Sequence, residues 1–287
     1  MPAGQLVERV LDVLEFLSGF PAGLSLTEIC RRRGLAKSAG HRILTGLVEC
    51  GFVEQDESSE HYRYTLKTTA IGFRYLAESG ITDLCQPILN ALAAKTGELS
   101  RLVIASGDTL TWVAKAQGAL FGLRYDADIG RPVVLHATAV GRAWLMTLDE
   151  EEAVRIVRKH GFSIPTRFNR SIVTDEPTLR AELCVSRKRG YGLACEEGEA
   201  GMVAIACPIF FPQGLHTRAV GTVSVAGPVV RIPPARAAEI AKDLNAAASE
   251  FSEIWPMRQF VGGGPVIARN GEGDERMACD LKNQRSG

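Results

Sequence analysis

Residues 24–52 read LSLTEICRRRGLAKSAGHRILTGLVECGF, and this pattern predicts two short helices joined by a tight turn. Ser25 and Glu28 have the spacing of a capping box, in which each side chain satisfies a backbone amide at the start of a helix. Gly34 then ends the first helix, because glycine adopts the left-handed conformation without a steric clash. A second helix is expected from about Ala36 to Cys50. Two helices around a glycine turn are typical of a helix-turn-helix, which presents its second helix to the major groove of DNA.

The outward face of the second helix is small, polar and basic, whereas apolar residues such as Ile43 and Leu47 occupy the other face. Arginines at the end of the first helix add positive charge, which suits contact with DNA phosphates. An ordinary helical hairpin with a solvated basic face is the alternative interpretation of these charges. The residues predicted to contact DNA from these helices are Arg31, Lys37, Ser38, His41, Arg42 and Thr45.

The sequence after the two helices predicts a β-hairpin wing. Residues 61–66 alternate like a β-strand, and a polar, turn-prone tip at 56–60 precedes them. Upstream, apolar residues between Leu6 and Leu17 have helical spacing and supply a third helix for the core. The segment is therefore expected to form a winged helix-turn-helix, in which Arg63 contacts a DNA phosphate. Because the tip is acidic, the wing is not expected to insert deeply into a groove.

The whole chain has 287 residues, a formal net charge of zero and a pI near 7.0. This length allows two ordinary domains or one large one. Because the net charge is zero, any affinity for nucleic acid must come from a local basic patch. No leading segment resembles a signal peptide, and no apolar run approaches the ~20 residues of a membrane span, so we expect a cytoplasmic protein with no membrane partner.

The seven cysteines are scattered without a Cys-x-x-Cys motif, and the five histidines show no metal-ligand spacing. We therefore expect no metal site and no cofactor. Cys30 and Cys50 lie on apolar faces of the predicted helices, where a small buried side chain is the favoured role.

Beyond the predicted wing, the chain changes from helical to strand-like patterning. A connecting helix is expected at about 69–78, and its broad apolar surface predicts packing on a partner. From Leu99 the period becomes two, and Gly107-Asp108 marks a hairpin turn. Antiparallel strands with helices packed against them make an α+β domain. The predicted divisions are a winged helix-turn-helix domain at 1–67, a linker helix at 68–80, the α+β domain at 81–256 and a disordered, Gly-rich tail at 257–287.

Three later motifs give the chain a resemblance to the IclR family of bacterial transcriptional regulators, over about Gln5 to Trp255. GYGLACEEGEAGMVAIACPIF at 190–210 is similar, without a gap, to the family pattern Gly-Tyr-Ala-Val-Asp-x-Glu-Glu-Asn-x-x-Gly-Val-x-Cys-Ile-Ala-Ala-Pro-Val. LHATAVGRAWL at 135–145 resembles the family's His-Ala-Thr-Ala-x-Gly-Lys-Ala element. GTVSVAGP at 221–228 resembles its Ser-x-Ser-Gly-Pro strand end.

The resemblance implies that the α+β domain is GAF-like, binds a small-molecule effector and associates into a dimer or a dimer of dimers. It also implies repression or activation of a nearby catabolic operon, and repression is the favoured prediction. Because one small recognition helix reads few bases, the operator is expected to be palindromic double-stranded DNA bound by a dimer. No catalytic residue is assigned, and the chain is not expected to be an enzyme.

The resemblance also carries a prediction about the effector. Family members that sense small keto acids hold the ligand oxygens through an Asp, a Cys and two Ser, and the matching positions here are Ala194, Ala204, Ser224 and Ala226. A two- or three-carbon acid depends on such hydrogen bonds, so it is disfavoured. An apolar wall suits a larger aromatic or amphipathic ligand, anchored by Ser224 with Arg124 as a further candidate. The other predicted effector contacts, for which core packing is the alternative, are Trp112, Gly122, Tyr125, Ala139, Val140 and Met202.

The recognition helix departs from the family pattern at two positions, Ala39 and Gly40. The family has Ser-Thr-Val-x-Arg at the start of this helix, where the chain has Ser38-Ala39-Gly40-His41-Arg42. Gly40 lowers the stability of the helix by about 1 kcal/mol relative to alanine. It is also expected to remove a side chain that normally packs.

Two alternatives to ligand sensing use the cysteines of the α+β domain. Cys195 and Cys207 lie on strands that are expected to be neighbours, so the chain is alternatively a redox-responsive regulator or a thiol enzyme on a GAF-like fold. The Glu196-Glu197 pair also suggests acid–base chemistry. Its position in a strand-to-strand connection favours backbone capping or solvation instead.

Overall fold

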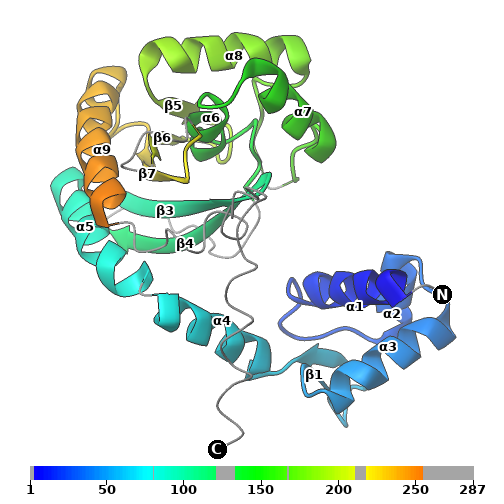
Figure 1. The fold of residues 1–287 in the computed structure, drawn as a ribbon. Helices are drawn as coiled ribbons and strands as arrows, with labels where there is room; N and C mark the ends of the chain where they lie inside the picture. Colours follow the sequence, from blue (N-terminus) through cyan, green and yellow to red (C-terminus); the bar gives the residue numbers. More distant parts are fainter. Residues whose placement is uncertain (1–2, 80, 121–132, 167, 211–217, 255–287) are drawn as a thin grey trace, which may run out of the picture. The chain divides into compact units, whose positions relative to one another are not determined.

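A computed structural model describes residues 3–79, 81–120, 133–166, 168–210 and 218–254 (Figure 1). The chain divides into two compact units, Met1–Gly80 and Ile81–Gly287. No helix among the described residues is long and apolar enough to span a membrane. The tail predicted at 257–287 lies outside the described residues.

The first unit is a helical domain with a two-stranded hairpin. In the core, Val13 and Leu17 meet Ile29, Leu44 and other apolar side chains of the next two helices and the first strand. The strands pair antiparallel, with Glu54 opposite Arg63. The elements are α1 (Ala3–Leu17), α2 (Leu26–Arg33), α3 (Lys37–Glu49), β1 (Val53–Gln55), β2 (Tyr62–Tyr64) and α4 (Leu66–Ser79). This arrangement confirms the winged helix-turn-helix.

The turn between α2 and α3 follows the predicted local chemistry with one difference. The Ser25 side chain accepts a hydrogen bond from the Glu28 backbone amide, and Gly34 ends α2 with a φ of 62°. The Glu28 carboxylate does not complete the capping box, because it accepts hydrogen bonds from Arg31 and Arg32 instead. The start of α2 is therefore capped by Ser25 alone.

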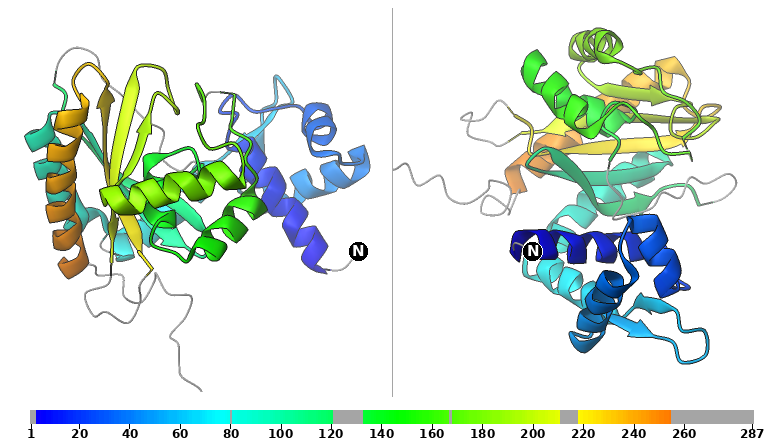
Figure 2. Two further views of the ribbon diagram at one scale, coloured as in Figure 1. Left: turned by 90° about the horizontal axis from the view of Figure 1, so that it is seen from above. Right: turned by 90° about the vertical axis from the view of Figure 1, so that its right-hand side faces the viewer.

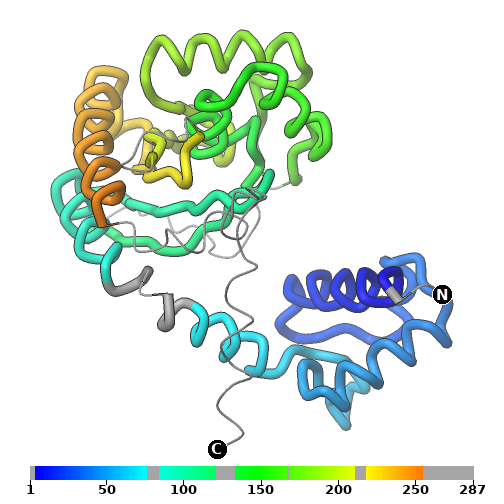
Figure 3. The backbone as a smooth tube through the Cα atoms, in the orientation of Figure 1, coloured from blue at the N-terminus to red at the C-terminus, as the bar shows by residue number. Residues whose placement is uncertain are grey.

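The second unit is built on a five-stranded antiparallel sheet with the strand order β4-β3-β7-β6-β5. In the described part of the chain, helices lie between the second and third strands of this sheet in chain order, and Figure 3 traces the same backbone as a tube. Its elements are α5 (Ile81–Thr96), β3 (Leu99–Ser106), β4 (Thr109–Gln117), α6 (Ala139–Leu145), α7 (Glu150–His160), α8 (Glu176–Arg189), β5 (Gly192–Cys195), β6 (Met202–Ile209), β7 (Gly221–Pro228) and α9 (Pro234–Ile254). The predicted α+β class with an antiparallel sheet is confirmed.

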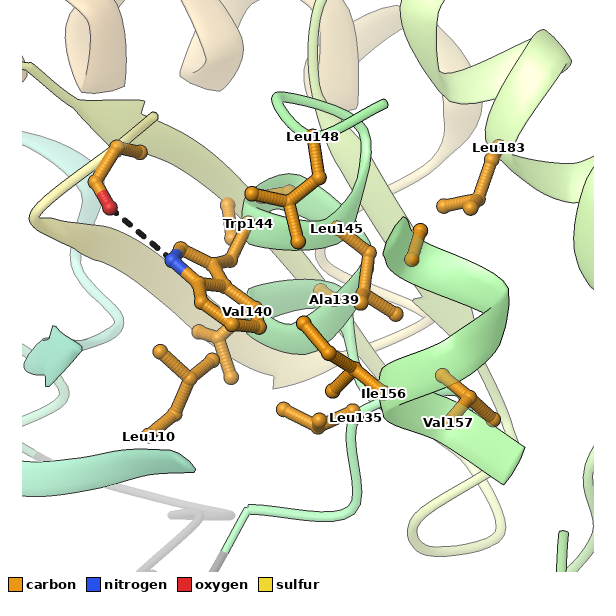
Figure 4. Close-up of a cluster of buried hydrophobic side chains, with 14 of the residues drawn as sticks. Leu110, Leu135, Ala139, Val140, Trp144, Leu145, Leu148, Ile156, Val157 and Leu183 are labelled. Atoms are coloured by element: carbon orange, nitrogen blue, oxygen red, sulfur yellow. Dashed lines mark hydrogen bonds between the residues drawn. The ribbon is translucent and has the colours of Figure 1, made fainter. Parts of the chain in front are cut away.

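Helices cover both faces of this sheet (Figure 2). Helices α5 and α9 pack together on one face, and α6 packs on the other, with α7 and α8 outside it. Figure 4 shows how the α6 side chains Val140, Trp144 and Leu145 fill the space toward Leu110 and Ile156. The indole Nε1 of Trp144 donates to the carbonyl of Ala219 at 3.0 Å. Helix α6, about two turns long, is thus held firmly against the sheet.

The edge strand β4 contains a β-bulge. Leu102 of β3 pairs with Ala114, but the next residue, Val103, pairs with Trp112. One residue of β4, Val113, is therefore additional. Because the bulge takes up this residue, Trp112 pairs with Val103 and faces the same side of the sheet.

Candidate DNA-binding surface and effector site

The recognition helix α3 separates an exposed polar face from a buried apolar one. Lys37, Ser38, His41, Arg42 and Thr45 are exposed. The buried face consists of Gly40, Ile43, Leu44 and Leu47. Within the described part of the chain, neither Lys37 nor Arg42 forms a salt bridge. Their positive charges are therefore available to phosphates.

The arginines of α2 differ from these two residues, because each of them forms an ion pair with an acidic side chain. Arg31 and Arg32 both pair with Glu28, at 2.9 and 2.5 Å, and Arg33 pairs with Asp12. Hydrogen bonds from Arg31 and then Arg32 lower the pKa of Glu28 to about 2. The run of basic residues that starts at Arg31 is thus partly neutralised by an acid in the preceding turn.

Arg63 lies on the wing, as predicted, but it also has acidic neighbours. Its Nε donates to Glu54 Oε1 at 2.7 Å, and its Nη2 lies 3.7 Å from Asp56 Oδ2. The hydrogen bond to Glu54 raises the pKa of Arg63. Hydrogen bonds from Ser58 and Ser59 hold the pKa of Asp56 below its usual range. The wing thus has more acidic than basic side chains, and a phosphate would compete with Glu54 for Arg63.

Gly40 is the point of closest contact between α2 and α3. A Cβ atom added to Gly40 would overlap the Sγ of Cys30, which is buried. Cys30 therefore occupies the space that a side chain at position 40 would fill, and no gap results. Cys30 is buried as predicted, but Cys50 is exposed, so its prediction as a buried residue is wrong.

The register of the sheet brings most predicted effector residues to one face. Ser224 pairs with Ala206, Ala226 pairs with Ala204, and Ala204 pairs with Ala194. This is the face on which α6 packs, because Ala194, Ala204 and Ala206 belong to one cluster with the α6 residues. The predicted residues gathered around this face are Trp112, Ala139, Val140, Ala194, Met202, Ala204, Ser224 and Ala226. We call it the α6 face; Gly122, Arg124 and Tyr125 lie outside the described residues.

The hydroxyl groups of β7 are the unsatisfied polar atoms of this face. Ser224 Oγ and Thr222 Oγ1 are buried, and neither has a hydrogen-bond partner among the described residues. A buried hydroxyl without a partner costs about 1–3 kcal/mol. Ser224 is the one position of the four matched to the keto-acid sites that retains a polar side chain.

Sequence reasoning missed Arg101, which lies on the same face. It pairs with Ser224 on one side and with Lys115 on the other, and it is only 8% exposed. Its Cζ lies 3.9 Å from the centroid of the Trp112 ring. The signal was present in the sequence, because Arg101 falls between Leu99 and Val103 in the period-two pattern of a buried strand.

The Glu196-Glu197 pair divides into two structural roles. Glu197 is buried and forms a bidentate ion pair with Arg142, at 2.7 and 2.6 Å. Arg142 also donates to the carbonyls of His136 and Leu193. Glu196 accepts from the backbone amide of Gly201 at 3.1 Å. Glu197 likewise accepts from the backbone amide of Ile172 at 3.0 Å, so the predicted backbone capping holds for both carboxylates, while burial excludes solvation of Glu197.

His136 lies beside this ion pair in the interior of the domain. It is buried, and its ring centroid is 5.6 Å from that of Phe162. Burial, and next the positive charge of Arg142, lower the pKa of His136. The imidazole is therefore neutral in the folded protein near neutral pH. Among the described residues, no group of three or more His, Cys, Asp or Glu side chains could hold a metal ion.

The two cysteines of the redox alternatives are far apart. Cys195 pairs with Val203, which is four residues before Cys207 on β6, a separation of about 13 Å along a strand. A disulfide requires Cα atoms within about 7 Å. Burial also raises the pKa of Cys207 to about 12, so its thiol is unreactive. The geometry contradicts a disulfide between these residues.

An open pocket of about 720 Å³ lies elsewhere in this unit, between the ends of α6, α8 and α9. Met146, Arg187, Phe210 and Ser249 are among the residues that line it. None of the predicted effector residues contributes to this lining. It is therefore separate from the α6 face.

Comparison with known families assigns both units. Residues 6–57 match the IclR helix-turn-helix domain, and residues 73–253 match the C-terminal domain of bacterial transcriptional regulator IclR. The two matches follow the same order as the winged domain and the α+β domain.

Individual relatives cover most of the chain. The HTH-type transcriptional regulator BhcR of Paracoccus denitrificans is 31% identical over 256 residues, 89% of each chain. The p-hydroxybenzoate hydroxylase transcriptional activator of Acinetobacter baylyi is 30% identical over 206 residues, 70% of this chain and 74% of that protein. A crystal structure of an IclR transcriptional regulator from Silicibacter sp. TM1040 superposes with a TM-score of 0.74 at 25% identity, covering 91% of this chain and 98% of that one. The chain therefore belongs to the IclR family of bacterial transcriptional regulators, with a DNA-binding helix-turn-helix domain followed by an effector-binding domain.

Proposed function

We propose that the chain is a ligand-responsive repressor of a catabolic operon, acting in the cytoplasm on a palindromic operator, and that its effector is an aromatic or amphipathic metabolite. The composition of the α6 face is the observation that supports this class of effector. Of the four positions matched to the polar keto-acid contacts, three are alanine and only Ser224 has a hydroxyl. The name of the relative from Acinetobacter, p-hydroxybenzoate hydroxylase transcriptional activator, supports an aromatic effector.

The proposed mechanism is a shift between two arrangements of the protein that differ in affinity for the operator. A ligand changes operator affinity only as far as it binds one arrangement more tightly than the other, typically by 1–3 kcal/mol. Helix α4 is the covalent connection between the two units and is the proposed route of coupling.

Self-association is part of this proposal. One recognition helix reads few bases, and a two-fold dimer on a palindrome doubles the contacts. Apolar side chains exposed on α1 and α4 of the single chain support a partner surface. They are Leu6, Val7, Leu11, Ile71 and Phe73.

A two-stage binding experiment tests this function. The purified full-length chain first selects sites from random double-stranded DNA, and we expect a palindromic consensus. Fluorescence anisotropy then measures the Kd for that site with and without aromatic acids or pyruvate. We expect an aromatic ligand to weaken operator binding roughly 5- to 150-fold. Tighter binding of pyruvate than of any aromatic acid in calorimetry would overturn the effector class, and a consensus without two-fold symmetry would overturn the dimeric operator.

A further inference from the structure

The α6 face carries a buried positive charge, that of Arg101, with Lys115 opposite it on β4 and the Ser224 hydroxyl opposite it on β7. Arg101 belongs to β3, which lies between β4 and β7 in the sheet. Two residues further along the same face is Val103 of the hydrophobic cluster. Arginine is rarely buried to this extent in a protein unless its charge meets an anion or an aromatic ring. Trp112 provides the ring, because the guanidinium carbon lies 3.9 Å from its centroid. Stacking uses the flat side of the guanidinium, whereas its N–H donors point outward in the plane of the group.

We propose that Arg101 binds the anionic group of the effector and that the effector is therefore a carboxylate. This inference rests on the proposed function, because it takes the α6 face as the effector site. A guanidinium has five N–H donors and no acceptor, so it can bind a carboxylate through two parallel hydrogen bonds while keeping other contacts. In a site with little water, such a charged pair is stronger than it is at the surface.

Ser224 is the second polar group of this subsite. It stands directly opposite Arg101 on the neighbouring strand β7, so the Cβ atoms of the two residues are about 4.5–5.5 Å apart. Its hydroxyl is fully buried and has no hydrogen-bond partner among the described residues. A carboxylate oxygen held by Arg101 would accept a hydrogen bond from this hydroxyl. The pair thus accounts for the hydroxyl that is retained at Ser224 beside the three alanines.

The remaining positions argue for a single carboxylate on a larger apolar body. Ala194, Ala204 and Ala226 supply no donor, so a phosphate or a second polar group of the ligand would stay unsatisfied there. Their small side chains face α6 and give an apolar wall for the rest of the molecule. The assigned chemistry is an aromatic or alicyclic monocarboxylate.

Acid and amide pairs of equal shape test this inference. We would measure binding of benzoate and benzamide, and of 4-hydroxybenzoate and 4-hydroxybenzamide, to the full-length chain by calorimetry at pH 7. In the unaltered protein, the acid should bind roughly tenfold or more tightly than its amide, since a charged hydrogen-bonding pair is lost with the amide. Arg101→Gln should abolish this preference, and Arg101→Lys should retain part of it.

Matched variants separate a local effect from general damage. Arg155→Gln makes the same change on α7, where Arg155 is exposed, and should leave the preference intact. Ser224→Ala should weaken acid binding less than Arg101→Gln does. Circular dichroism and unchanged amide binding show that the Arg101 variants are folded.

The outcomes distinguish a failure of the Arg101 assignment from a failure of the proposed effector class. If amides bind as tightly as acids and change operator affinity equally, the assignment of Arg101 is wrong while the aromatic effector stands. A preference for acids that survives in Arg101→Gln also overturns the assignment. If no acid and no amide binds the unaltered protein, both the carboxylate assignment and the aromatic effector fail, while operator binding remains to be judged by the DNA selection.

Discussion

At the scale of single residues, Gly40 and Cys30 show how one position can be understood only together with another. Gly40 lies on the buried side of α3, and Cys30 of α2 fills the volume that a larger residue would occupy. The sequence alone shows a helix with an unfavourable glycine. The fold shows that the glycine allows two helices to approach each other.

The contact predicts a dependence between the two residues. Gly40→Ala should destabilise the protein, because overpacking costs about 1–3 kcal/mol while the gain in helix propensity is at most about 1 kcal/mol. In a Cys30→Ala background, the same substitution should become neutral or stabilising. Urea unfolding of the two single variants, the double variant and the unaltered protein measures this coupling. An equal effect of Gly40→Ala in both backgrounds would contradict the contact.

His136 provides a second test at this scale. Because burial lowers its pKa in the folded state, the unfolded state takes up the proton first, near its ordinary pKa of about 6.5. The contribution of His136 to stability is therefore present above about pH 6.5 and is lost as the pH falls from there through the folded pKa. Thermal unfolding of the unaltered protein and of His136→Gln, compared from pH 8 to pH 5, should show a smaller loss in the variant. Parallel curves for the two proteins would rule this contribution out.

At the scale of elements, the helix-turn-helix separates two kinds of basic residue. Those of α3 face outward without a salt bridge among the described residues, whereas those of α2 are held by Glu28 and Asp12. Exposed ion pairs contribute little to stability, but they reduce the charge that a phosphate meets. The helix predicted to read DNA is therefore also the one whose charges are least compensated among the described residues.

This difference predicts a ranking of charge variants. Lys37→Ala and Arg42→Ala should each weaken operator binding and reduce the slope of log Kd against log salt concentration by about 1. Arg31→Ala should have a smaller effect, because Glu28 already holds its guanidinium. Anisotropy titrations over a range of salt concentrations measure both quantities. The ranking is wrong if Arg31→Ala changes the salt slope as much as Arg42→Ala does.

The sequence predicted most elements of the fold because local signals determine them. Gly34, Gly107 and Gly190 lie at the ends of helices or in turns, and the period of the apolar residues distinguishes helix from strand. The sequence did not predict which side chains pair between different elements. Glu197 meets Arg142, which is 55 residues away, and nothing in the local pattern of either residue indicates that ion pair.

The candidate effector site was predictable only in part for the same reason. The family resemblance placed Ser224 and the three alanines, which the sheet register then brought to one face. Arg101 was missed because no family motif includes it. Its importance depends on the strand pairing that places it opposite Ser224.

At the scale of the whole molecule, a second copy of the chain is required by the proposed mode of action. Leu11 and Phe73 are 59% and 67% exposed in the single chain, which is unfavourable for large apolar side chains unless a partner covers them. Burial of each such side chain contributes about 1.5–3 kcal/mol.

Charge placed on this surface should therefore separate the copies. We expect Leu11→Glu and Phe73→Glu to raise the Kd for self-association roughly tenfold or more and to weaken operator binding in parallel. Sedimentation velocity at several protein concentrations measures the change. Val230→Glu, an equally drastic change at a residue that is 83% exposed in the other unit, is the matched control. Self-association that is equal in all four proteins would place the interface elsewhere.

The extra residue in β4 has a consequence for how this strand can evolve. Arg101 and Trp112 lie on one side of the sheet because the bulge at Val113 takes up the additional residue of β4. A deletion of Val113 would remove the bulge and place Trp112 next to Ala114, but Trp112 would stay opposite Val103 and on the side of Arg101. The bulge therefore absorbs one additional residue without changing which side chains of β4 face α6. At this position β4 can differ in length by one residue between related chains and still retain the stacking partner of Arg101.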